Sequence, residues 1–271
     1  MKLSLTAWSL PSCTLKEAAD ISKALGIGAL DVGLFYRSAL DKKLILADPH
    51  VAAVPLADLG VDVPNYYHLF GDGLAGRNLA LPGTLAANLR DLKQVLTFAD
   101  AAKIGTVFIL PGIINPGQSR ADAAQVSTES LAAMGAIATG FNTTLCFEPH
   151  VHSFCESPRI ALDLVEQSGV KLALDYAQFT CLGYRQDEID PLARHAAHIH
   201  LRQAKMGALQ AKFAHGTLNF PAMFGTLRAI GYQGALSLEP VHQDYMNTLF
   251  EDVLSEIIAL RDCYTAWSEE N

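Results

Sequence analysis

The chain has 271 residues, half of them hydrophobic and 18% charged, which is typical of a folded globular protein with a large core and no disordered tail. The formal net charge of −8 argues against a nucleic-acid partner, because binding phosphates requires clusters of Lys and Arg. No apolar run approaches the ~20 residues of a membrane span, and the N-terminal residues turn polar too soon for a signal peptide. Five cysteines without a C-x-x-C pair fit reduced thiols. We therefore expect a cytoplasmic protein that acts on a small molecule.

Short apolar runs alternate with helical patterns along the whole chain. Strands are expected at residues 2–9, 29–34, 66–70, 105–110, 143–147, 171–174, 196–199 and 234–238. Helices are expected at residues 14–25, 38–47, 84–103, 121–139, 157–167, 220–230 and 243–267. Eight strands with helical crossovers predict an α/β protein with a single (β/α)8 TIM barrel spanning residues 1–271. A doubly wound open sheet is the competing fold, but residues 10–13 are not its glycine-rich phosphate loop.

Two regions of the sequence bear on where helices form. Thr14, with Glu17 three residues later, predicts a capping box at the start of the first helix. Residues 48–65 hold prolines at positions 49, 55 and 64 and are expected to form turns rather than a helix.

Four of the expected strands end in a side chain that can bind a metal ion: Glu148, Asp175, His200 and Glu239. Because the carboxyl ends of barrel strands meet at one mouth, we expect these side chains to lie together. Three carboxylates and an imidazole suit manganese, magnesium, cobalt or zinc, and a divalent cation would offset the cost of burying three carboxylates. Each residue taken alone could equally be a helix N-cap or a salt-bridge partner.

The segments around these residues resemble the xylose isomerase-like (AP endonuclease family 2) barrels. The resemblance extends over about residues 143–240 and rests on residues 145–150, 172–175, 198–202, 216–221 and 231–239. It implies that Glu148, Asp175, His200 and Glu239 hold one divalent metal ion, with Glu148 and Glu239 as the catalytic acid/base pair. His200 rather than His198 is expected to be the ligand, because it directly precedes Leu-Arg.

The sequence departs from this family at two positions. Gln178 stands where the family often has a histidine, and strand four ends in Leu110 without one. A glutamine can bind a substrate hydroxyl group but cannot carry a proton between groups. Both departures argue against the multi-zinc phosphodiester cleavage of the endonuclease branch.

The resemblance implies an isomerase or epimerase of a small sugar, sugar phosphate or hydroxy-keto acid, working by glutamate-mediated proton transfer through a metal-stabilised enediolate. His68, His150, Gln178 and Arg202 are the expected substrate contacts, against the alternatives of histidines satisfied within the protein and a salt-bridged arginine. Trp8 is expected in the core rather than as a pocket wall.

Two other functions stay open at this point. One is a metal-dependent dehydratase of a cyclic polyol, and the other is a non-catalytic sugar-binding barrel. The final helix must bury an apolar face that includes Leu249, Phe250, Val253 and Ile257. That face could cover the barrel or pack on a second subunit of a homo-oligomer.

Overall fold

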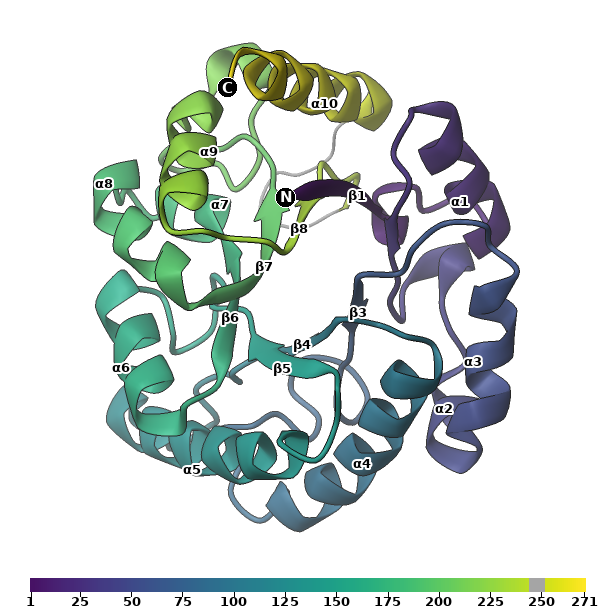
Figure 1. The fold of residues 1–271 in the computed structure, drawn as a ribbon. Helices are drawn as coiled ribbons and strands as arrows, with labels where there is room; N and C mark the ends of the chain where they lie inside the picture. Colours follow the sequence, from purple (N-terminus) through teal and green to yellow (C-terminus); the bar gives the residue numbers. More distant parts are fainter. Residues whose placement is uncertain (244–251) are drawn as a thin grey trace.

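The computed structural model describes residues 1–243 and 252–271, and within these ranges eight parallel strands form a ring surrounded by helices (Figure 1). The strands are β1 (Lys2–Thr6), β2 (Leu30–Asp31), β3 (Asn65–Tyr67), β4 (Thr106–Ile109), β5 (Thr144–Phe147), β6 (Lys171–Asp175), β7 (Ala196–Leu201) and β8 (Ala235–Leu238). Their order in the sheet is β2-β1-β8-β7-β6-β5-β4-β3. A parallel bridge between Val32 and Tyr66 joins the two outer strands. The predicted (β/α)8 barrel is confirmed.

Helices of very different lengths follow the strands. They are α1 (Leu15–Ala24), α2 (Lys42–Ala47), α3 (Pro49–Ala57), α4 (Leu85–Ala101), α5 (Arg120–Ala138), α6 (Pro158–Ser168), α7 (Tyr176–Thr180), α8 (Gln186–Ile189), α9 (Phe220–Ala229) and α10 (Val253–Glu270). Helix α10 lies beside β1 and the N-terminus in Figure 1. The predicted final helix began at Gln243, which is not helical, and its residues Leu249 and Phe250 lie outside the described ranges.

The residues at the two ends of helix α6 determine where this helix begins and ends. The Ser157 side chain accepts a hydrogen bond from the Ile160 backbone N–H, and Pro158 occupies the first turn, where its missing N–H costs nothing. Gly169 ends the helix with φ of 72°, a left-handed conformation that glycine adopts without a steric penalty. These caps fix where the chain leaves β5 and enters β6, and so where the side chains at those strand ends lie.

Thr14→Ala is expected to destabilise the protein by about 1 kcal/mol. The Thr14 side chain accepts from the Glu17 backbone N–H, while the Glu17 carboxylate accepts from the Thr14 N–H, so the predicted capping box is present. Urea unfolding measures the change. A urea midpoint equal to that of the wild type, with an unchanged slope, would contradict it.

The prediction for residues 48–65 was wrong, because helix α3 occupies half of them. Asp48 caps this helix by accepting from the Val51 backbone N–H, and Pro49 fills the first turn. Pro55 lies in the last turn of the same helix, where it removes one hydrogen bond to a carbonyl group. The prolines therefore begin the helix and weaken its end instead of preventing it.

The interior of the barrel contains a buried polar cluster around Asp31. One carboxylate oxygen of Asp31 lies 2.7 Å from His198 Nε2 and accepts from Ser237 and Asn65, and the other oxygen accepts from Ser4. Burial alone would raise the pKa of Asp31, but His198 beside it holds the pKa below its ordinary value. This cluster lies beneath the predicted metal-binding residues and fixes the His198 ring that contacts His200 edge-on.

Candidate active site

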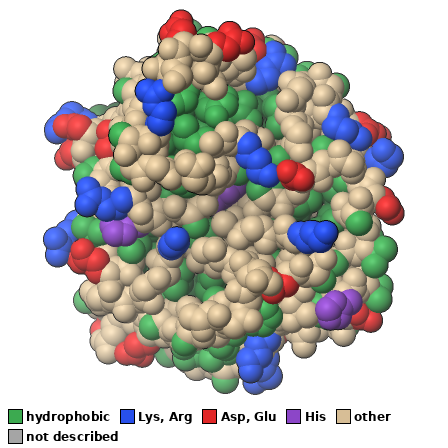
Figure 2. All heavy atoms as spheres, in the orientation of Figure 1, with side chains coloured by type: hydrophobic (Ala, Val, Ile, Leu, Met, Phe, Trp, Pro, Cys, Tyr) green, Lys and Arg blue, Asp and Glu red, His purple; other side chains and the backbone are tan. Residues whose placement is uncertain are grey.

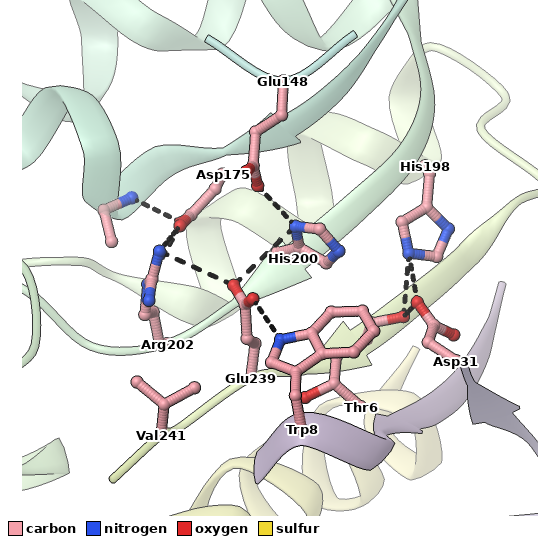
Figure 3. Close-up of polar contacts among 12 residues, drawn as sticks. Thr6, Trp8, Asp31, Glu148, Asp175, His198, His200, Arg202, Glu239 and Val241 are labelled. Carbon is pink, nitrogen blue, oxygen red and sulfur yellow. Dashed lines mark hydrogen bonds and ion pairs between the residues drawn. The ribbon is translucent and has the colours of Figure 1, made fainter. Parts of the chain in front are cut away.

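The four predicted metal-binding residues stand where strands β5 to β8 end. Glu148 follows β5, Asp175 is the last residue of β6, His200 lies near the end of β7, and Glu239 follows β8. The strand register pairs Asp175 with His200, so adjacent strands carry these two side chains at the same height. All four are buried, with at most 7% of their surface exposed. Figure 3 shows their side chains pointing toward one another.

Three of the four form one compact group. His200 Nδ1 lies 2.7 Å from Glu148 Oε1 and 3.7 Å from Glu239 Oε2. One ligand atom from each residue falls within 4.8 Å of the others, close enough for all three to bind a single cation. The imidazole ring is held from the side by edge-on contacts with Trp8 and Phe108. We call these three residues the Glu-His-Glu cluster.

Asp175 lies beside this cluster but is held by Arg202. The Arg202 guanidinium donates to Asp175 Oδ2 through Nε at 2.9 Å and through Nη2 at 2.5 Å. The other carboxylate oxygen of Asp175 accepts from the Ala177 backbone N–H at 2.8 Å. Both oxygens therefore have partners, and Asp175 could bind a cation together with the cluster only by sharing or releasing Arg202. Its role as a metal ligand stays a prediction.

The buried charges shift the pKa values of the cluster strongly. Burial raises the pKa of Glu148 to about 7, although His200 beside it opposes the shift. Burial alone would lower the pKa of His200, but the carboxylates of Glu239 and Glu148 raise it to about 10. Burial also raises the pKa of Asp175 against the opposing charge of Arg202. At neutral pH these shifts favour a proton held between Glu148 and His200.

The donor set fits a divalent cation. Three carboxylates face one guanidinium and one imidazole, so a cation that displaces the imidazole proton would balance the remaining negative charge. Glu239 Oε2 is buried without a hydrogen-bond partner among the described residues, and the Arg202 guanidinium is 3.6 Å away. A buried carboxylate oxygen left without a hydrogen bond is costly, and a metal ion would satisfy it. Mixed oxygen and nitrogen ligands suit zinc, manganese, cobalt or magnesium.

A pocket of about 370 Å³ opens onto the two glutamates of the cluster, and its volume is within the range of roughly 300–1,000 Å³ for small-molecule sites. Glu148 and Glu239 line it together with three of the four predicted substrate contacts: His150, Gln178 and Arg202. Gln178 Oε1 accepts from the Val151 backbone N–H, while Arg202 is engaged with Asp175. The fourth predicted contact, His68, lines a smaller adjoining chamber instead. The structure thus brings three of these residues to the main pocket and places His68 next to it.

Aromatic residues form the opposite wall of the pocket, and the sequence analysis missed most of them. Phe35, Tyr36, Tyr67 and Trp8 line this side. Trp8 is buried as expected, but its indole N–H also donates to Glu239 Oε1 at 2.8 Å, so it fixes the orientation of that carboxylate. The available signal was their position in the sequence, since each lies at the end of one of the first three strands or a few residues after it.

A larger hollow of about 840 Å³ lies at the other end of the barrel. It is lined by residues at the beginnings of strands, such as Lys2, Thr106 and Ala235. Barrel enzymes bind their substrates at the carboxyl ends of the strands, and the Glu-His-Glu cluster lies there. We therefore place the candidate active site in the smaller pocket, which Glu148 and Glu239 line.

The buried imidazole of His68 is expected to make stability depend on pH. Burial, helped by the charges of Lys42 and Arg77, lowers its pKa to about 3, against about 6.5 in an unfolded chain. The stability that the neutral His68 ring contributes is fully present above pH 6.5 and is lost as pH falls toward 3. Over that range the unfolded chain binds one more proton than the folded chain. His68→Gln should reduce the slope of the free energy of unfolding between pH 5 and 4 by about 1.4 kcal/mol per pH unit.

Urea unfolding at a series of pH values measures this slope, with His50→Gln as the matched control because His50 is exposed on α3. Equal slopes for His68→Gln and wild type would mean that His68 is charged in the folded protein.

The charged side chains of the described residues are distributed over the face of the molecule drawn in Figure 2. Acidic and basic side chains are interspersed on the face in Figure 2 and form no patch of one sign there. Among the described residues, no helix is long and apolar enough to cross a membrane.

The fold and the cluster define a (β/α)8 barrel with a carboxylate and imidazole site at the carboxyl ends of its strands. The chain belongs to the family described as the xylose isomerase-like TIM barrel (AP endonuclease family 2), whose model matches residues 55–261. The resemblance inferred from the sequence is confirmed. A search of the curated proteins gives no match.

Solved structures with the same fold include enzymes of more than one kind. L-ribulose 3-epimerase matches with a TM-score of 0.73 and 17% identity, covering 100% of this chain and 95% of its own. The IolI protein with a bound zinc atom matches with a TM-score of 0.74 and 15% identity, covering 99% of both chains. The probable 3-DHS dehydratase AsbF from Bacillus anthracis matches with a TM-score of 0.72 and 12% identity, covering 98% and 99%. At such identities the likeness shows the fold alone.

Proposed function

We propose that this protein is a divalent-metal-dependent isomerase or epimerase of a small sugar or hydroxy-keto compound. The observation that carries the proposal is the placement of two buried glutamates beside the same imidazole nitrogen, at 2.7 and 3.7 Å from His200 Nδ1, where both also line a pocket of small-molecule size. A pair of carboxylates flanking a bound substrate can remove and return a proton. The epimerase among the structural neighbours is consistent with this chemistry.

The residues proposed to hold the metal ion are Glu148, His200, Glu239 and, once it is released from Arg202, Asp175. A bound divalent cation would act as a Lewis acid that stabilises negative charge on the oxygens of the substrate. The IolI protein, which shares the fold, holds a zinc atom. Zinc, manganese, cobalt and magnesium all accept such ligands.

The protein surroundings of the two glutamates differ. Burial raises the pKa of Glu148 to about 7, near the value at which a carboxyl group exchanges protons most readily at neutral pH. The Trp8 N–H holds one oxygen of Glu239 and leaves the other, Oε2, without a hydrogen bond. One glutamate would remove the proton next to the carbonyl group and the other would return it, to the opposite face or to the neighbouring carbon.

A dehydratase is the second candidate, favoured by the likeness to a probable dehydratase. It would use the same base and the same cation but expel water from the substrate. A non-catalytic sugar-binding barrel is the third candidate, and in it the two glutamates would serve only as metal ligands, without a role in proton transfer.

Incubation of the protein with candidate ketoses in deuterated water distinguishes the isomerase or epimerase, the dehydratase and the non-catalytic binding barrel. The metal-loaded protein should exchange one carbon-bound hydrogen of its substrate for deuterium, and mass spectrometry and NMR measure the exchange. Product lighter by one water molecule identifies the dehydratase. Binding of a ketose without any exchange or loss of water would leave the binding barrel.

A further inference from the structure

A small side chamber adjoins the catalytic pocket between the loops that follow β3, β4 and β5. It shares Leu69, Leu74, Leu110 and His150 with the pocket, and His68 lines the chamber but not the pocket. Its free volume is about 10 Å³, which is close to the space that one water molecule needs. The chamber can therefore take one group of the size of a hydroxyl.

The two histidines of the chamber each have one nitrogen atom without a partner. His150 Nδ1 lies 2.7 Å from the Val151 carbonyl oxygen, and His68 Nδ1 lies 3.0 Å from the Tyr66 hydroxyl. Nε2 of both rings is buried and makes no hydrogen bond within the described residues. Each such atom costs about 1–3 kcal/mol if nothing binds it. Both residues line the same chamber, which indicates that a small polar group binds there, either a water molecule or a hydroxyl group of a ligand.

The hydrogen bonds define which ligand fits. Because the Val151 carbonyl can only accept, His150 Nδ1 carries a proton, and Nε2 of a neutral ring is then an acceptor. His68 can present Nε2 as a donor when its Nδ1 accepts from Tyr66. A hydroxyl group donates to one ring and accepts from the other.

The rest of the chamber excludes an anion. Apart from the two imidazoles and Asn78, its lining is aliphatic, aromatic or glycine, and no Lys or Arg is among the described residues that line it. A phosphate or carboxylate there would lose its hydration without a cation in the lining, since Lys42 and Arg77, whose charges act on His68, are engaged with the Gly71 carbonyl and with Asp91. The Asn78 side chain is already engaged: its oxygen accepts from the backbone N–H groups of Ala80 and Ile113, and its amide nitrogen donates to Asn115.

We propose that the side chamber is a specificity subsite in which His68 and His150 together bind one hydroxyl group of a neutral polyhydroxy ketone. The inference rests on the proposed function, because the reacting carbons of the same molecule would lie at the Glu-His-Glu cluster. It adds one requirement to the proposed substrate class: the group that enters the chamber is a hydroxyl group and not a phosphate or carboxylate.

The test measures binding by calorimetry to the zinc-loaded protein. The ligands are neutral ketopentoses and ketohexoses, including L-ribulose, their terminal phosphates, and monodeoxy analogues of the ketose that binds best. One deoxy analogue should bind at least ten-fold more weakly than its parent to the wild type. His68→Leu and His150→Leu should bind the parent about ten-fold more weakly and no longer distinguish it from that analogue.

Two further variants separate recognition from folding. His68→Gln and His150→Gln retain hydrogen-bonding groups and should recover part of the discrimination, while His50→Gln, on the exposed face of α3, should behave as wild type. Undiminished binding and discrimination in both leucine variants, or equal binding of the parent ketose and all of its monodeoxy analogues by the wild type, would overturn the subsite. If neutral ketoses bind as expected but exchange no hydrogen with the solvent, the proposed isomerase fails while the subsite stands. If no ketose binds, both fail.

Discussion

Glu148→Gln and Glu239→Gln should each abolish measurable hydrogen exchange between the substrate and deuterated water, with a loss of roughly 10²–10⁴-fold. Glutamine has nearly the shape of glutamate but cannot accept and return a proton. The substitution also removes one of the two charged ligands of the Glu-His-Glu cluster. The loss should therefore appear in turnover even at metal concentrations that restore occupancy, which separates the proton-transfer role from the ligand role.

A matched control is Glu166→Gln, because Glu166 is exposed on α6, away from the pocket. It should exchange hydrogen at the rate of the wild type. If either cluster variant retained more than a tenth of that rate with metal bound, the altered glutamate would not be the acid or base.

Arg202→Met should lower the free energy of unfolding of the metal-free protein by about 3–5 kcal/mol. Arg202 is buried and makes two hydrogen bonds to Asp175 Oδ2. Methionine fills much of the same space but leaves the buried carboxylate without its counter-charge. Urea unfolding measures the change. Saturating zinc or manganese should recover a large part of it, because Asp175 would then be free to bind the cation.

Arg185→Met is the control for this experiment. Arg185 is exposed and pairs with Asp187 and Glu188 at the surface, where solvent screens ion pairs and they contribute little to stability. Equal losses in the two variants would show that the pair between Arg202 and Asp175 does not stabilise the fold. Failure of metal to restore stability in Arg202→Met would remove Asp175 from the proposed ligand set.

The barrel and the Glu-His-Glu cluster were predictable because they follow from short-range signals. A parallel strand buried on both faces appears as a continuous apolar run, and the residue that ends it points to the mouth of the barrel. Glu148, His200 and Glu239 each end such a run, and the structure brings them together. The sequence marks these positions without any knowledge of the intervening loops.

Contacts between distant segments were not predictable. Nothing near Trp8 in the chain indicates that its N–H would reach Glu239, because the two residues meet only where β1 pairs with β8. The ion pair between Arg202 and Asp175 depends in the same way on the register of β6 and β7. Helix α3 was missed for another reason, since Pro49 and Pro55 favour turns unless a cap such as Asp48 precedes them.

The most direct test of the account is elemental analysis of protein purified without chelator, comparing wild type with Glu239→Gln and His200→Ala. The account predicts about one divalent ion per wild-type chain and a large loss of that ion in both variants, since each removes a ligand of the cluster. No bound metal in the wild type after incubation with manganese and with zinc would contradict the proposed metal centre, and the proton-transfer chemistry built on it.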